Sequence, residues 1–147
     1  MGEAASPEKL FVDTWGWLVL ANDRDPAFEG VSRLRATAAK RAGAWVTSDY
    51  VLDETITRLF ASAPFANARR FCEALFESSQ TGLVDLERVT AERFHAAWQL
   101  RLRYRDKPRI SFTDLTSFVV MRELRLPKAL TSDTHFSEAG FEALLSE

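Results

Sequence analysis

The stretch Lys9-Leu10-Phe11-Val12-Asp13-Thr14-Trp15 decides the fold. Three apolar residues followed directly by an acid are typical of a strand that is buried on both faces and ends at Asp13. The run comes early in a chain in which strands and helices alternate, so we expect it at the centre of a sheet. Sites in open α/β sheets form beyond the carboxyl ends of the strands, which makes Asp13 the first candidate site residue.

Composition indicates one folded domain with a sizeable core. The chain has 147 residues, of which 46% are hydrophobic, and it is rich in phenylalanine and tryptophan. This length suits a single domain, 1–147, in which we predict residues 1–8 to be a flexible leader. The formal net charge of −2 excludes a global positive field for nucleic acid, although it is compatible with local basic patches.

The same composition indicates the compartment. Cys72 is the only cysteine, so one chain can build neither a disulfide framework nor a cysteine zinc site. The N-terminal residues lack the apolar core of a signal peptide, and no apolar run is long enough to cross a bilayer. We therefore expect a cytoplasmic protein without a membrane partner.

The remaining pattern alternates strands with helices. After the first strand we expect short strands at 44–47, 82–86, 129–132 and 141–145. Apolar residues at spacings of three and four predict helices at 27–42, 50–63, 65–79, 90–102 and 110–124. Such alternation is typical of an α/β fold with three layers, in which helices cover both faces of a parallel, five-stranded sheet.

Four acids take equivalent places in this pattern. Asp13 and Asp133 end two of the strands, and Glu54 and Asp114 lie near the starts of two helices. Because strand carboxyl ends and helix N-termini share one edge of a parallel sheet, all four acids should lie on that edge. Gathered carboxylates repel one another unless a cation compensates them. Oxygen ligands without clustered His or Cys favour Mg²⁺, with Mn²⁺ as a substitute.

This predicted metal centre indicates a reaction. One or two such ions can generate hydroxide and stabilise an in-line displacement at phosphorus, so the acids predict metal-dependent phosphodiester hydrolysis. Each acid taken alone has a simpler interpretation as a helix cap or as a first-turn acid favoured by the helix dipole. Helix capping alone, however, does not require acids at the ends of the strands that lead to Asp13 and Asp133. This favours the interpretation in which the four acids form one metal site.

At these residues the sequence resembles the PIN-domain ribonuclease family, and especially its VapC-type toxins. The resemblance covers about Leu10 to Leu144. It rests on the order and spacing of short phrases, of which the last is the most specific: Phe11-Val12-Asp13-Thr14, residues 47–55, Ser111-Phe112-Thr113-Asp114 and residues 130–136.

This resemblance implies a fold and a biological role. The fold is a sheet with strand order 3-2-1-4-5, and the activity is endoribonucleolytic. Such toxins dimerise and are held inactive by a cognate antitoxin that occludes the acidic site. Asp53 neighbours Glu54, but a helix turns by about 100° per residue, so the two cannot both point inward, and the family pattern favours Glu54. The implied Mg²⁺ ligands and catalytic residues are Asp13, Glu54, Asp114 and Asp133.

A dense basic segment directly precedes Asp114. From it, Arg105, Lys107 and Arg109 can reach the acidic edge and contact the phosphates of an RNA substrate. The alternative is a solvated helix end whose cations suit the C-terminal dipole. This choice stays open at the level of sequence.

Smaller polar residues flank the predicted site acids. Thr14 and Ser132 are candidates for holding substrate, a carboxylate or a metal-bound water, and a hydroxyl bonded to the backbone is the equally weighted alternative. His135 follows Asp133 by two residues; it could contact substrate, but we favour a packing role.

The leading hypothesis is therefore a Mg²⁺-dependent endoribonuclease acting as the toxin of a type II, VapBC-like pair. One alternative is a PIN-domain nuclease of RNA processing, and another is a non-catalytic RNA- or protein-binding module on the same fold. A phosphatase with Asp13 as nucleophile would need a second acid at the position of Trp15, so we disfavour it.

Overall fold

The structure is a computed structural model that describes residues 8–144. The predicted leader lies outside the described residues, apart from Glu8, whose carboxylate pairs with Lys128 Nζ at 2.6 Å. The described strands are β1 (Leu10–Val12), β2 (Trp45–Ser48), β3 (Val84–Glu87), β4 (Lys128–Leu130) and β5 (Glu142–Leu144). The helices are α1 (Thr14–Leu20), α2 (Phe28–Ala38), α3 (Asp49–Ser62), α4 (Phe65–Gln80), α5 (Ala91–Arg103), α6 (Phe112–Leu124) and α7 (Thr134–Glu138).

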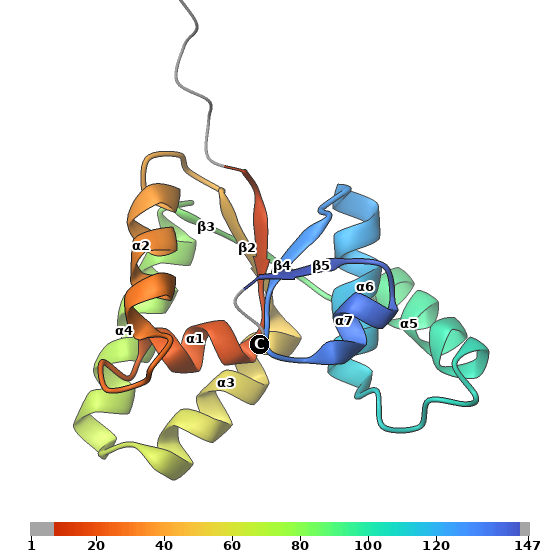
Figure 1. Cartoon of the computed structure of the whole chain (residues 1–147), viewed down its shortest axis with the longest axis horizontal. Coiled ribbons are helices and arrows are strands. Elements are labelled where there is room, and N and C mark those ends of the chain that lie inside the picture. The colour runs from red at the N-terminus through yellow and green to blue at the C-terminus, as the bar shows by residue number, and fades with distance from the viewer. Residues whose placement is uncertain (1–7, 145–147) are drawn as a thin grey trace, which may run out of the picture.

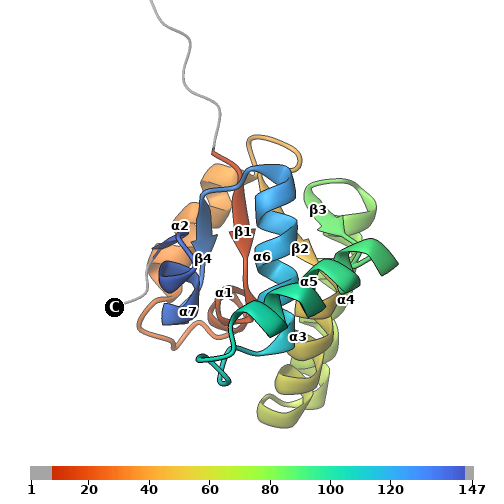
Figure 2. The ribbon, with the colours of Figure 1, turned by 90° about the vertical axis from the view of Figure 1, so that its right-hand side faces the viewer.

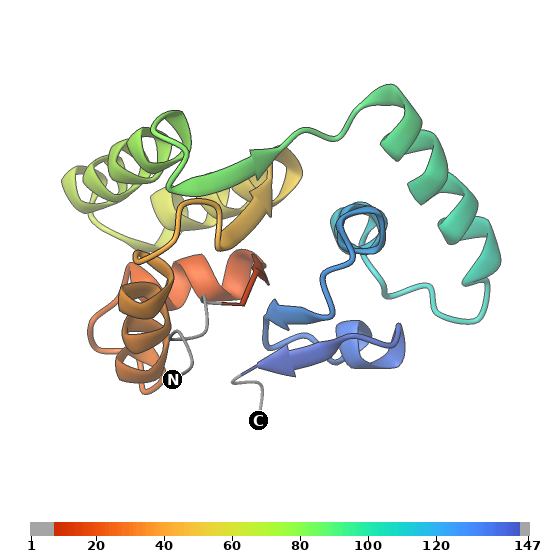
Figure 3. The same cartoon turned by 90° about the horizontal axis from the view of Figure 1, so that it is seen from above.

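The sheet has the predicted topology. The strands are parallel and follow the order β3-β2-β1-β4-β5, which confirms the predicted five-stranded sheet with strand order 3-2-1-4-5. Helices α1 to α4 lie on one side of the sheet, and α5 to α7 lie on the other (Figures 1 and 3). Figure 2 shows α5 crossing the outer side of α6, against which it packs. The three-layer α/β/α fold is thus confirmed.

Strand β1 is the middle of the sheet, as its apolar run predicts. Phe11 pairs with Val46 of β2 on one side and with Ala129 of β4 on the other, and its side chain is fully buried. The backbone amide of Asp13 continues the ladder by donating to the carbonyl of Leu130 at 3.1 Å. The acid at the end of β1 therefore lies directly beside the residue that follows β4.

Helix α1 packs unusually close to the sheet. A Cβ atom on Gly16 would lie 2.9 Å from both Leu130 Cδ2 and Val12 Cγ1, so only glycine allows this approach. One residue on, Trp17 is buried and donates from Nε1 to Thr47 Oγ1 at 3.2 Å, and that hydroxyl donates to the carbonyl of Val12 at 2.9 Å. These contacts fix the helix that begins immediately after Asp13.

Side-chain caps set the starts of the helices at the site edge. Ser48 Oγ accepts from the amide of Val51 to begin α3, and Ser111 Oγ accepts from the amide of Asp114 at 3.0 Å to begin α6. An oxygen at the N-cap satisfies an amide that has no partner within the helix. The same device operates at α7, where Asp133 Oδ1 accepts from the amide of His135 at 2.8 Å.

Several element boundaries differ from the prediction; β4, for example, ends at Leu130 rather than at residue 132. Helix α2 ends at Ala38 rather than at residue 42, because its last buried residue is Ala38 and the following turns lead to Gly43 at φ +77°. Strand β3 begins at Val84 rather than at residue 82, since Gly82, at φ +81°, belongs to the preceding turn. Residues 134–138, expected only as a tight segment, form the short helix α7.

No helix within residues 8–144 combines the length and the apolar character needed to span a bilayer.

Candidate active site and metal centre

Asp13 is buried at the carboxyl end of β1. Its side chain is held by Thr131, whose Oγ1 donates to Oδ2 of Asp13 at 2.8 Å. Burial raises the pKa of Asp13 to about 6, against the opposing effects of this bond and of a bond from the Thr14 backbone; the charges of Glu54 and Asp133 add to the rise. The charged form of Asp13 is therefore disfavoured in the absence of a nearby cation.

Asp114 reaches the same place from the first turn of α6. Its side chain is 8% exposed, and burial raises its pKa to about 9, helped by a hydrogen bond with Asp133 and by the charges of Asp13, Asp133 and Glu54. Burial would also raise the pKa of Asp133, but bonds from Asp114 and from the His135 backbone lower it below the ordinary value. The pKa values of the two neighbouring carboxyls thus shift in opposite directions, upward for Asp114 and downward for Asp133.

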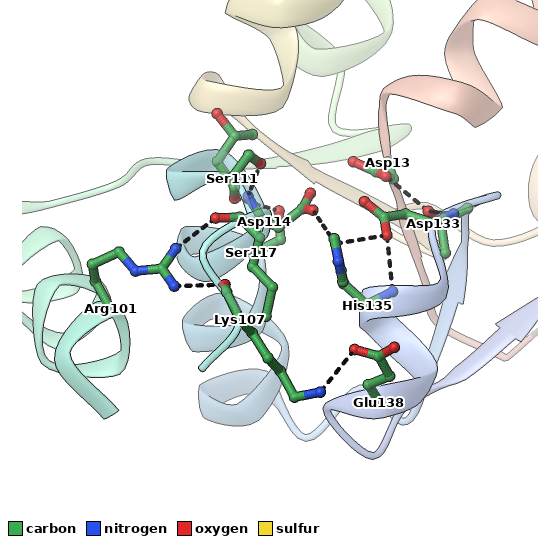
Figure 4. Close-up of polar contacts among 12 residues, drawn as sticks. Asp13, Arg101, Lys107, Ser111, Asp114, Ser117, Asp133, His135 and Glu138 are labelled. Carbon is green, nitrogen blue, oxygen red and sulfur yellow. Dashed lines mark hydrogen bonds and ion pairs between the residues drawn. The ribbon is translucent and has the colours of Figure 1, made fainter. Parts of the chain in front are cut away.

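His135 completes the cluster. Its Nδ1 lies 3.0 Å from Asp133 Oδ1 and 3.9 Å from Asp114 Oδ2 (Figure 4). Nδ1 is buried, and despite the short distance to Asp133 it has no hydrogen-bond partner among the described residues. Ligand atoms of Asp114, Asp133 and His135 all lie within 4.8 Å of one another, a spacing that one metal ion can bridge.

Glu54 approaches from the second turn of α3. Its side chain is 38% exposed and its Oε1 lies 3.5 Å from Arg58 Nη1, one turn along the helix. Its charge raises the pKa of both Asp13 and Asp114, which shows that it lies on the same edge, although it is more peripheral. The neighbouring Asp53 is exposed, so the two acids do differ in orientation.

The basic segment forms the loop between α5 and α6, which we call the basic arm (residues 104–110). Arg105 and Arg109 are exposed, and neither has a hydrogen bond or ion pair to any residue in the described range 8–144. Lys107 Nζ lies 3.3 Å from Glu138 Oε2, which ties the arm to α7 (Figure 4). Lys107 is therefore the cation of the arm that contacts an element of the acidic cluster, whereas Arg105 and Arg109 are exposed and unpaired within residues 8–144.

The two predicted hydroxyl residues lie differently. Thr14 is buried, and its Oγ1 is 3.5 Å from the carbonyl of Val51, so its side chain faces α3. Ser132 is exposed beside the site, with no hydrogen bond to another described residue. The hydroxyl that contacts a site acid belongs instead to Thr131.

Comparison with known proteins assigns the fold to a family. The family model described as "PIN domain" matches residues 10–142, almost the whole described range. The chain belongs to the PIN-domain family. This confirms the resemblance inferred from the phrases around Asp13, Glu54, Asp114 and Asp133.

Two curated relatives sharpen the assignment. The chain is 35% identical over 132 residues to the "23S rRNA-specific endonuclease VapC20" of Mycobacterium tuberculosis strains CDC 1551 and H37Rv, a match that covers 90% of this chain and 95% of the relative. The crystal structure of M. tuberculosis VapC20, described as a sarcin-ricin loop cleaving toxin, superposes with a TM-score of 0.76 at 33% identity, covering 90% and 96% of the chains. The predicted enzyme class, a VapC-type toxin endoribonuclease, is confirmed.

Sequence reasoning missed two residues of this PIN-domain site. The first is Thr131: the pairing of β1 with β4 puts it, the first residue past β4, opposite Asp13, whereas the sequence favours Ser132. The second is Arg101, whose guanidinium binds the backbone of the basic arm. The strand register would have revealed the first; no local pattern marks the second.

Proposed function

We propose that this VapC-type enzyme is a Mg²⁺-dependent toxin whose ion is held by Asp13, Glu54, Asp114 and Asp133, with Mn²⁺ as a substitute. The observation that carries the proposal is the close spacing of Asp114, Asp133 and the buried Nδ1 of His135, which lies 3.0 Å from Asp133 Oδ1. Burial, with a smaller contribution from neighbouring acids, raises the pKa values of Asp13 and Asp114 to about 6 and about 9, and a divalent cation would stabilise their charged forms. The residues therefore fit the metal that the fold family implies.

The proposed roles of the four acids follow from their positions in the fold. When bound, the ion supplies Lewis-acid stabilisation and lowers the pKa of a water molecule. Asp13 and Asp114, buried and fixed by strand and helix, hold the ion rigidly at the sheet edge. Asp133 links the ion site to α7 through its cap. Glu54, being half exposed, is the acid best placed to contact a water that enters from solvent.

We further propose that the substrate is ribosomal RNA. The relative VapC20 is a 23S rRNA-specific endonuclease described as cleaving the sarcin-ricin loop. Arg105, Lys107 and Arg109 of the basic arm are the proposed phosphate-binding residues, with the exposed Ser132 beside them. Thr14 is proposed to act indirectly, since its backbone supports Asp13. A solvated arm without contact to RNA is the competing interpretation of the same charges.

The proposed partners are a cognate antitoxin and a second copy of the chain, both in the cytoplasm. Helix α5 supports dimerisation because Phe94, Trp98 and Leu102 recur on one face and are 48%, 48% and 49% exposed. Large apolar side chains left exposed at helical spacing are typical of a surface that another protein covers. These assignments extend the role of the VapC-type relatives to this chain.

The experiment that tests the function uses the purified chain and intact ribosomes. We expect one cut in 23S rRNA, mapped by primer extension, that requires Mg²⁺ or Mn²⁺ and is lost in Asp13→Asn. Expression without antitoxin should arrest growth, whereas Asp13→Asn should not. Intact rRNA with a folded, metal-loaded protein would overturn the rRNA assignment, and cleavage in excess chelator would overturn the metal assignment.

A further inference from the structure

Arg101, in the last turn of α5, holds the basic arm by its backbone. Its Nη1 donates to the carbonyl of Ile110 at 2.6 Å, and its Nη2 donates to the carbonyls of Tyr104 and Lys107 at 2.8 and 2.7 Å. The three carbonyls belong to the beginning, middle and end of the arm, and Figure 4 shows Arg101 pointing toward Lys107. One guanidinium therefore fixes the conformation of the entire loop.

The backbone that Arg101 holds carries two cationic side chains without a partner among the described residues. Arg105 and Arg109 project from the held backbone into solvent and lack a partner within residues 8–144. A second attachment, from Lys107 to Glu138, ties the arm to the helix that starts at Asp133. The arm is thus attached to α5 through Arg101 and to α7, which Asp133 caps, through Lys107.

We propose that Arg101 is a positioning residue for RNA binding, which aims Arg105 and Arg109 at the phosphates of a strand seated on the acidic cluster. The inference rests on the proposed function. A loop that is ordered before binding loses less conformational freedom when RNA arrives, so the same cations bind more tightly. The planar fork of arginine suits three carbonyls, whereas lysine presents a compact point charge that cannot span them.

A purely structural role for Arg101 makes a different prediction. Ile110 is buried and directly precedes Ser111, which caps the helix that carries Asp114. If Arg101 acted only through this route, its loss would weaken metal binding and kcat. A positioning role instead raises KM for RNA and leaves the metal centre intact.

The test compares Arg101→Lys with Arg103→Lys, which lies two residues away on α5, is exposed and has no partner among the described residues. Both variants keep the charge, so they differ only in the hydrogen bonds lost. The substrate is a 23S rRNA fragment that contains the sarcin-ricin loop. For Arg101→Lys we expect KM to rise about tenfold, the size of one charge-assisted hydrogen bond, with unchanged kcat and Mn²⁺ affinity. Arg103→Lys should match the parent chain.

A double-mutant cycle sharpens the test. The combined variant Arg105→Gln and Arg109→Gln should raise KM in the parent chain. In the Arg101→Lys background the same two changes should raise KM little further, because the arm is already misplaced there. Glu138→Gln provides a second variant, at the surface. Removing this anion should by itself strengthen RNA binding and lower KM, but it also releases Lys107 and with it the arm. We expect the release to dominate, so that KM rises. Additive effects, an unchanged KM in Arg101→Lys, or a loss of Mn²⁺ affinity would overturn the inference. A parent chain that leaves the fragment uncut would overturn the proposed rRNA substrate, and the inference with it.

Discussion

The hydroxyl of Thr131 donates a 2.8 Å hydrogen bond to Oδ2 of Asp13. The bond joins the residues that directly follow the paired strands β4 and β1, so the sheet register itself brings them together. Since the hydroxyl stabilises the charged carboxylate, it opposes the effect of burial on the pKa of Asp13. Asp13 is thereby kept ionisable near neutral pH although it is buried.

Thr131→Val tests this relationship. Loss of the donor should raise the pKa of Asp13 above its present value of about 6, so a higher pH is needed to ionise it. The acid limb of the pH–rate profile for RNA cleavage should move to higher pH, while the plateau rate at high pH changes little. Thr131→Ser keeps a hydroxyl and should retain the parent profile; identical profiles for Val and Ser would contradict the assignment.

The stability of the metal-free protein should fall as pH rises. The folded-state pKa values of Asp13 and Asp114 lie at about 6 and about 9, above the ordinary value of 3.8. A group with a raised folded-state pKa contributes its full share of stability at pH values below its pKa in the unfolded chain. That contribution is lost as the pH rises through its pKa in the folded protein. For Asp13 the loss is at most about 3 kcal/mol.

Urea unfolding in chelator between pH 4 and pH 10 measures this effect. We expect Asp114→Asn to flatten the decline and to be more stable than the parent chain at pH 9, because an amide carries no charge to bury. At high pH, Mn²⁺ should increase the free energy of unfolding of the parent chain, whereas it should change that of Asp114→Asn little. A parent chain whose free energy of unfolding rises over this pH range would contradict the raised pKa values of these buried carboxyls.

His135 should act as a nitrogen ligand. Imidazole binds later transition metals such as Co²⁺ better than Mg²⁺, which prefers oxygen. For His135→Asn, calorimetric titration should show Co²⁺ affinity falling by about tenfold, a size typical of altered metal surroundings, with Mg²⁺ affinity changed little. An equal loss for both ions would indicate that His135 only orients Asp133.

Much of this site could be predicted because the signals are local. The carboxylate of Asp13 is placed at the sheet edge by the three-residue apolar run that directly precedes it. The carboxylate of Asp114 is placed there by the Ser111 cap that begins its helix. The roles of Thr131 and Arg101 depend on partners far away in sequence or on backbone carbonyls, which leave no pattern of residue types. The imidazole of His135 turned inward because the Asp133 cap forms the short helix α7, which the sequence indicated only as a tight segment.

Gly16 tests how closely α1 must approach the sheet. In Gly16→Ala the new methyl group would lie 2.9 Å from side-chain atoms of Val12 and Leu130, two core residues that can move only by repacking. We expect a loss of about 1–3 kcal/mol in the free energy of unfolding, measured by urea at neutral pH with saturating Mn²⁺. Unchanged or increased stability would show that helix and sheet are less closely packed.

Metal-dependent cleavage by the acidic cluster is the central claim, and a Mn²⁺ titration of RNA cleavage tests it most directly. The parent chain and Asp114→Asn are compared on 23S rRNA in otherwise identical, chelator-treated buffer. We predict that the parent chain is inactive without metal and gains activity along a saturable binding curve, while Asp114→Asn stays inactive at every Mn²⁺ concentration. Cleavage by the parent chain without metal, or an equal titration curve for Asp114→Asn, would contradict the account.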